Sequence, residues 1–148
     1  MRVMPIVSSN PAQANKQQNF KSQFVANKVL KDAFNQAEKT GCRFFMTSVK
    51  NLLNDGLKRT IELTGSVLVS KDGIVYTKTK LKVNEDEKEV AGFPHIYDTS
   101  CEEMIANDAR LLIIDMNKLN NYPNYNEMDK ETVRNEIRKL EKQIFKKQ

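Results

Sequence analysis

The chain has 148 residues, of which 39% are hydrophobic and 29% charged, a composition typical of one globular domain. No apolar run approaches the roughly 20 residues that a membrane-spanning helix needs, so we expect a soluble protein without a membrane span. Five of the 24 basic residues lie in the first 31 positions, which hold no acidic residue, so 19 remain to balance the 19 acidic residues. The net charge of +5 therefore belongs to the N-terminal segment, and it gives little support to a polyanion ligand for the folded body.

Residues 1–20 combine Ser, Asn, Pro, Gln and Ala without apolar periodicity, which predicts a mobile basic leader before a single domain at residues 21–148. The leader lacks the continuous apolar stretch of a secretory signal peptide. An organelle-targeting role stays an alternative, although the leader has few arginines. With two cysteines, Cys42 and Cys101, the chain needs no disulfide framework, and we take the cytoplasm as the default compartment.

Two amphipathic helices are predicted next. Apolar residues recur at three- and four-residue spacing from Val25 to Ala37, which predicts a helix over residues 22–39 that ends in a left-handed cap at Gly41. A second apolar stripe, from Phe45 to Leu53, predicts a helix that ends before residue 56. Neither helix gathers titratable groups on one face, so we expect both to serve packing.

Residues 59–83 give the clearest local signal, which predicts a β-hairpin. A loop of residues 71–73 with Gly73 in the left-handed region would pair Ser70 with Ile74 and fix the register. One face would then pair Ile61 with Val83, Leu63 with Leu81, Gly65 with Thr79, Val67 with Thr77 and Val69 with Val75. The other would pair Glu62 with Lys82, Thr64 with Lys80, Ser66 with Lys78 and Leu68 with Tyr76. We expect the core to cover the first, mostly apolar face and water the second.

The remaining elements are a charged turn at residues 84–89, at most a short third strand, and two further helices. Residues 98–119 predict a helix with a buried stripe from Ile105 to Leu119, although its run of four apolar residues would also suit a buried strand. Residues 120–126 predict a loop, and residues 127–147 a helix. The apolar seam of this last helix consists of Val133, Ile137, Leu140 and Ile144. It spans about two heptads, so docking on the core is favoured over self-association.

These elements predict an α+β domain. Two N-terminal helices precede a central antiparallel hairpin, and two C-terminal helices pack on the sheet.

The segment "FPHIYDTSCEE", residues 93–103, gathers residue types used in catalysis. It holds His95, the only histidine, and Cys101 near a predicted helix start, where a thiol can become a nucleophile if an imidazole takes its proton. The alternative is a helix start in which Thr99 with Glu102, or Ser100 with Glu103, forms a capping box. The capping alternative is favoured because no catalytic signature surrounds the cysteine and the adjacent glutamates oppose a thiolate.

The chain offers no pattern for a metal or a nucleotide cofactor, and we expect neither. Structural zinc requires four Cys or His ligands, whereas the chain has three such residues. The acidic segment at residues 84–89 lacks the glycine and the ligand spacing of a calcium loop. None of the five glycines are spaced as in a dinucleotide-binding motif or a phosphate-binding loop.

A second candidate surface is the outward face of the hairpin, where Tyr76, Lys78, Lys80 and Lys82 project at alternate positions. A cationic row beside an aromatic ring can bind phosphates and stacked bases, but lysines on exposed strands also prevent edge association. We therefore predict a non-enzymatic interaction or regulatory protein. Binding of nucleic acid or another polyanion through this face and the leader is the alternative, and a cysteine-dependent hydrolase or transferase built on Cys101 and His95 is the third hypothesis.

Overall fold

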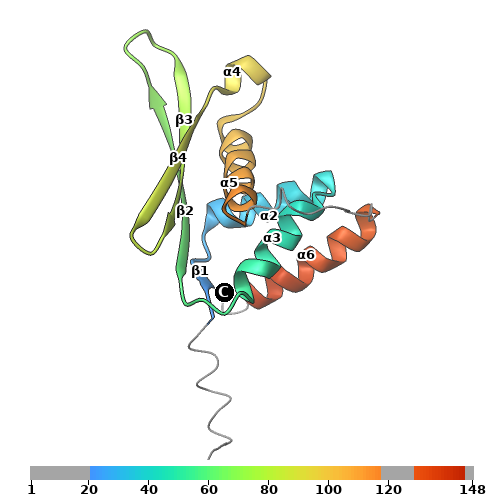
Figure 1. Ribbon diagram of the computed structural model, residues 1–148. Helices are drawn as coiled ribbons and strands as arrows, with labels where there is room; N and C mark the ends of the chain where they lie inside the picture. The colour runs from blue at the N-terminus through green and yellow to red at the C-terminus, as the bar shows by residue number, and fades with distance from the viewer. Residues whose placement is uncertain (1–20, 118–128, 146–148) are drawn as a thin grey trace, which may run out of the picture.

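The computed structural model describes residues 21–117 and 129–145, which form a four-stranded sheet with helices on one of its faces (Figure 1). The elements are, in chain order, β1 (Gln23–Phe24), α2 (Lys28–Thr40), α3 (Arg43–Leu53), β2 (Thr60–Val69), β3 (Val75–Val83), β4 (Asp86–Gly92), α4 (Pro94–Tyr97), α5 (Cys101–Asn117) and α6 (Lys130–Phe145). The predicted α+β class is confirmed, but the sheet has four strands rather than a hairpin. The predicted leader and the loop at residues 120–126 lie outside the described residues.

The first helix begins six residues later than predicted, because residues 23–24 form β1 alongside the start of β2. Asn27 sets the boundary. Its side-chain oxygen accepts a hydrogen bond from the Leu30 N–H at 3.0 Å and caps α2, while its amide group donates to the Leu63 carbonyl of β2 at 2.8 Å. The apolar residues before Asn27 have the spacing of a helical stripe, but they lie in extended backbone. The predicted cap at Gly41 is confirmed, with a φ of 69°.

The predicted hairpin register is confirmed for every pair from Ile61–Val83 to Val69–Val75. Gly73 has a φ of 82°, and the Ser70 N–H donates to the Ile74 carbonyl at 2.9 Å. The predicted charged turn is wrong for residues 86–89, which form most of β4. These residues are extended because their glutamates lie opposite β3 lysines, and only residues 84–85 make the turn.

The third predicted helix is confirmed, but it begins at Cys101 rather than at residue 98. Asp98 has a left-handed φ of 53° and ends the short helix α4 instead. The apolar run at residues 111–114 lies within α5, so the strand alternative for it is wrong. Leu119 of the predicted stripe lies outside the described residues.

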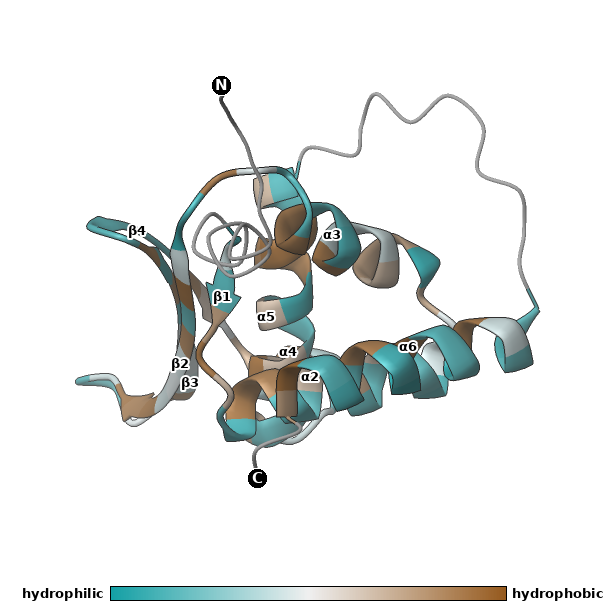
Figure 2. Ribbon diagram, turned by 90° about the horizontal axis from the view of Figure 1, so that it is seen from below, coloured by the Kyte–Doolittle hydropathy of each residue, from teal (hydrophilic) through white to brown (hydrophobic). Residues whose placement is uncertain are grey.

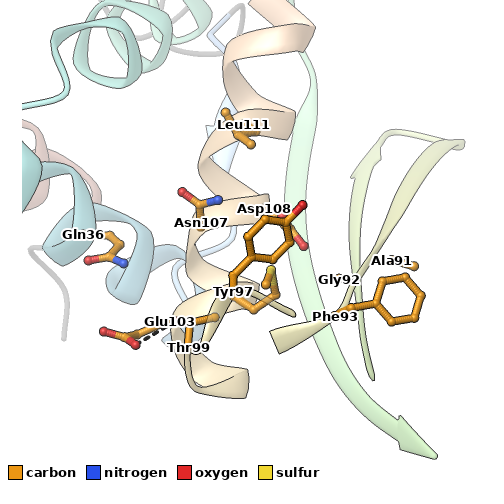
Figure 3. A pocket seen from close by; sticks show the side chains of 11 residues that line it. Gln36, Ala91, Gly92, Phe93, Tyr97, Thr99, Glu103, Asn107, Asp108 and Leu111 are labelled. Carbon is orange, nitrogen blue, oxygen red and sulfur yellow. Dashed lines mark hydrogen bonds between the residues drawn. The ribbon is translucent and has the colours of Figure 1, made fainter. Parts of the chain in front are cut away.

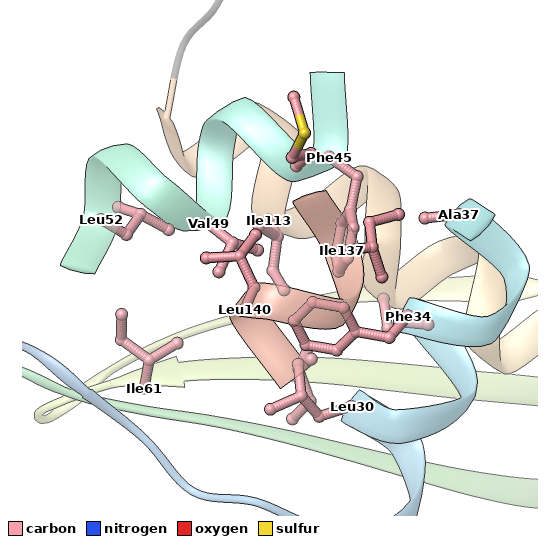
Figure 4. Packing of buried hydrophobic residues seen from close by; sticks show 14 of the residues in the cluster. Leu30, Phe34, Ala37, Phe45, Val49, Leu52, Ile61, Ile113, Ile137 and Leu140 are labelled. Atoms are coloured by element: carbon pink, nitrogen blue, oxygen red, sulfur yellow. The ribbon is translucent and has the colours of Figure 1, made fainter. Parts of the chain in front are cut away.

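Helix α5 packs on the sheet, and α6 packs mainly on α2 and α3 at the far side of α5 (Figure 2). The core between them includes Phe34, whose ring makes an edge contact with Phe45 at 5.1 Å (Figure 4). A second edge contact joins Phe34 to Phe145 at 6.0 Å. The seam of α6 faces this core. Val133, Ile137 and Leu140 are buried there and Ile144 is half-buried, which confirms docking within the chain. None of the helices in the described ranges is long and apolar enough to cross a membrane.

Candidate functional site

Residues 99–103 form the start of α5, and their polar groups satisfy one another. The Ser100 hydroxyl accepts from the Glu103 N–H at 3.0 Å, and the Ser100 N–H donates to a Glu103 carboxylate oxygen at 3.4 Å. The predicted capping box of Ser100 with Glu103 is therefore confirmed. The Thr99 hydroxyl donates to the same oxygen at 2.8 Å, and this bond, followed by the Ser100 N–H, lowers the pKa of Glu103 below its usual range.

The predicted catalytic pair lies around this helix start without a shared hydrogen bond. His95 is exposed on α4, and its ring stands edge-on to Phe93 with the centroids 6.4 Å apart. Cys101 is a free, half-buried thiol in the first turn of α5. Both residues belong to the described part of the chain, and no hydrogen bond joins them. A cysteine-dependent activity stays a prediction without a supporting contact.

The predicted polyanion-binding residues, Tyr76, Lys78, Lys80 and Lys82, share the outer face of the sheet. Lys78 lies 3.2 Å from Glu89, and Lys80 lies 3.6 Å from Glu87, both on β4. Tyr76 stacks on Phe93 at 6.0 Å. Each cationic position therefore faces an acidic one, since Lys82 pairs with Glu62 and with Glu87 in the two registers. Polyanion binding also stays a prediction, and the acids of β4 weaken the field on which it would depend.

Within residues 21–117 and 129–145, the part of β2 beyond Leu63 has no neighbouring strand on one side. We call residues 65–69 the distal edge. β1 pairs only with Thr60 and Ile61, and Asn27 takes the Leu63 carbonyl. Because the Ser70 N–H bonds across to Ile74, the even-numbered residues of β2 bond to β3, and the backbone groups of Gly65, Val67 and Val69 face outward. In the described ranges, no strand pairs with these outward groups.

The helices also leave the distal end of the hairpin uncovered. On the helix-facing side, Ile61, Leu63 and Leu81 are buried, whereas Val67 is 54% exposed, Val69 64% and Val75 44%. The expectation that the core covers this whole face is therefore wrong for Val67, Val69 and Val75, although Thr77, which pairs with Val67, is fully buried. Ile105 of α5 packs on Gly65 of β2, where the uncovered part of the strand begins.

A cleft of about 520 Å³ lies where α5, α4 and the end of β4 meet (Figure 3). Its lining includes Tyr97, Met104, Asp108 and Leu111. Asp108 is 7% exposed, and its Oδ2 atom has no hydrogen-bond partner among the residues that the structure describes. Burial raises the pKa of this carboxyl group. No motif in the sequence marks Asp108, although its position four residues after Met104 and one before buried Ala109 places it on the apolar side of the helix.

Asp108 is expected to give the stability of the protein a defined pH dependence. Because its pKa is raised in the folded state, its favourable contribution is fully present below the unfolded-state pKa and is lost as the pH rises through the folded-state pKa. We therefore expect Asp108→Asn, which stays neutral, to be more stable than the wild type at neutral pH. The difference should shrink in acid, below the ordinary aspartate pKa of about 3.9.

Urea unfolding of both proteins across this pH range measures the effect. Asp115→Asn is the matched control, since Asp115 is exposed on the same helix and pairs with Lys88 at 3.4 Å. A stability difference between Asp108→Asn and the wild type that stayed constant with pH would contradict the expectation.

No group of three or more His, Cys, Asp or Glu side chains in the described ranges is arranged to hold a metal ion. No protein-family model matches the chain, and neither the curated proteins nor the solved structures contain a significant match to it.

Proposed function

We propose that this chain is a non-enzymatic interaction module that pairs with an extended protein segment along the distal edge of β2. The observation that carries the proposal is the state of residues 65–69, whose outward backbone groups have no strand partner among the described residues. An extended segment that adds to such an edge gains main-chain hydrogen bonds along its length.

The two edges of the sheet differ in their side chains. β4 carries Asp86, Glu87, Lys88 and Glu89, and Lys88 also reaches Asp115 of α5 at 3.4 Å. The distal edge of β2 carries no charged side chain. Natural sheets commonly protect free edges with charges, because an uncharged edge pairs readily with other strands. The protection of β4 and its absence on β2 support β2 as the edge that accepts a partner.

The uncovered valines give the incoming strand an apolar surface to pack against. Val67, Val69 and Val75 lie on the helix-facing side of the hairpin beyond the reach of α5. Side chains from an added strand would extend this surface and remove part of it from water, which is favourable. An apolar, uncharged segment therefore fits the edge better than a charged one.

A second copy of the chain supplies such a segment. Two distal edges in antiparallel pairing centred on Val67 would place Val67 opposite its own copy, Leu68 opposite Ser66 and Val69 opposite Gly65, and would bring no like charges together. Figure 1 shows the β2–β3 hairpin extending beyond α2, α3 and α6, which leaves the edge accessible. We therefore take a second copy as the partner to be tested.

Val67→Pro tests this edge with little effect on the ladder between β2 and β3. Proline removes the outward N–H of residue 67, while the bonds to β3 come from residues 66 and 68. We expect sedimentation velocity to show a concentration-dependent dimer for the wild type and a monomer for Val67→Pro. Val67→Thr is the matched control because it keeps the N–H and the β-branched shape, and it should still form the dimer.

A labelled peptide of residues 63–70 separates self-association from binding of another protein. One outcome is a monomeric wild type that binds the peptide, with binding about tenfold or more weaker in Val67→Pro. The edge then accepts a strand as proposed, and the partner is another protein. A wild type that neither dimerises nor binds the peptide would show that the proposal is wrong. Circular dichroism verifies that both variants are folded.

A further inference from the structure

We infer that the cleft between α5, α4 and β4 binds a protonated amine. The ammonium group would contact the Asp108 carboxylate, and its apolar stem would lie against Met104 and Leu111. This site is separate from the distal edge of β2 and does not depend on strand addition.

The cleft has the size and lining of a small-ligand site. Its volume of about 520 Å³ lies within the range of roughly 300–1,000 Å³ that is usual for such sites. Figure 3 shows the Tyr97 ring and the α5 side chains on one side of the end of β4, whereas the Phe93 ring points to the other side. Met104 is buried, Leu111 is exposed, and Asn107 adds a polar amide.

Asp108 is the side chain in the cleft that an ammonium ligand would stabilise. Its side chain is more than nine-tenths buried, and the backbone of β4 packs directly onto it, since a Cβ atom at Gly92 would lie only 2.8 Å from Oδ2. A carboxylate buried without a hydrogen bond or a counter-ion is strongly disfavoured. An ammonium group supplies both, because it is a cation with three donors.

The described part of the chain provides no counter-ion for Asp108. Two of the residues that line the cleft, Asp108 and Glu103, are acidic, and none is basic. None of the described basic side chains pairs with Asp108. Lys88 pairs with Asp115, Arg110 donates to Thr40 and Asn107, and Lys39 acts on Glu103, whose pKa it helps to lower. The negative charge of the cleft therefore favours a cationic ligand.

An organic cation fits the cleft better than a metal ion. Hard metal ions prefer six or more oxygen ligands, whereas the Glu103 carboxylate is already bonded to Thr99 and Ser100. The Tyr97 ring and the Met104 thioether provide polarisable surfaces, which suit an ammonium group on an alkyl stem. A free alkylamine and a lysine side chain share this chemistry.

Hexylammonium chloride is the probe for this inference, followed by chemical-shift changes of the wild-type protein at neutral pH. We expect saturable shifts around Gly92 and Asn107. Asp108→Asn should weaken the binding by about thirtyfold or more, because it removes the charge that the ammonium group pairs with. Asp115→Asn, which removes an exposed charge from the same helix outside the cleft, should bind as the wild type does.

Two neutral comparisons complete the test. Hexanol has the same stem without the charge and should bind at least about tenfold more weakly than hexylammonium. Equal binding of hexanol and hexylammonium to the wild type, or unchanged binding to a folded Asp108→Asn variant, would overturn the inference. Nα-acetyl-lysine methylamide distinguishes the source of the amine, since tighter binding than hexylammonium indicates a lysine of a protein and weaker binding a free amine.

Discussion

Replacing Phe34 with alanine is expected to lower the free energy of unfolding by about 3–5 kcal/mol. Phe34 is fully buried, and its ring contacts Phe45 of α3 and Phe145 of α6. The side chain therefore joins three helices, and its removal leaves a cavity that none of them can fill alone. Because domains of this size are stable by about 5–15 kcal/mol, the variant should be close to unfolding.

Urea denaturation followed by circular dichroism measures this loss. Phe34→Leu is the matched control, since it keeps much of the apolar volume, leaves a smaller cavity and should cost clearly less than the alanine variant. An alanine variant as stable as the leucine variant would show that the three helices close around the cavity.

The second large effect is expected at Gly65, where alanine should destabilise the protein by about 1–3 kcal/mol. Gly65 does not have a positive φ, so its backbone would accept any residue. Alanine in a strand is ordinarily better than glycine by roughly 0.5–1 kcal/mol. Here, however, its Cβ would lie 2.5 Å from Cγ2 of Ile105 on α5. Isoleucine is stiff at this branch, so α5 would have to move away from the sheet.

The Ile105→Ala background tests this explanation. All three of the nearest atoms to the added Cβ belong to Ile105, so the clash should vanish when that side chain is shortened. In this background, we expect Gly65→Ala to be neutral or stabilising, and a double-mutant cycle gives the coupling. An equal loss of stability in both backgrounds would rule out the contact with Ile105 as the cause.

Local sequence signals were sufficient where the interacting residues are close in the chain. The loop ending at Gly73 fixed the register of β2 and β3, and the capping box of Ser100 and Glu103 spans only four positions. The consecutive charges within residues 84–89 predict a turn, because nothing within this segment indicates that Glu87 and Glu89 pair with Lys80 and Lys78 of another strand.

The cleft could not be predicted from the sequence, because the residues around Asp108 also come from separate elements. Asp108 becomes unusual only when Gly92 of β4 and Tyr97 of α4 come to lie beside it, and this arrangement depends on the tertiary fold. The distal edge could be predicted only in part from the sequence. The uncharged composition of residues 63–70 can be read from the sequence, but the early end of β1 and the short reach of α5 cannot.

The uncharged edge of β2 also affects the concentration that the protein can reach in a cell before it aggregates. Short β-prone segments without charge or proline are those that stack into cross-β fibrils when they are exposed. Residues 63–70 have this composition, and part of the segment lies on an open edge. The open edge thus makes the unpaired form prone to fibril formation, and the proposed pairing of two copies would cover the segment.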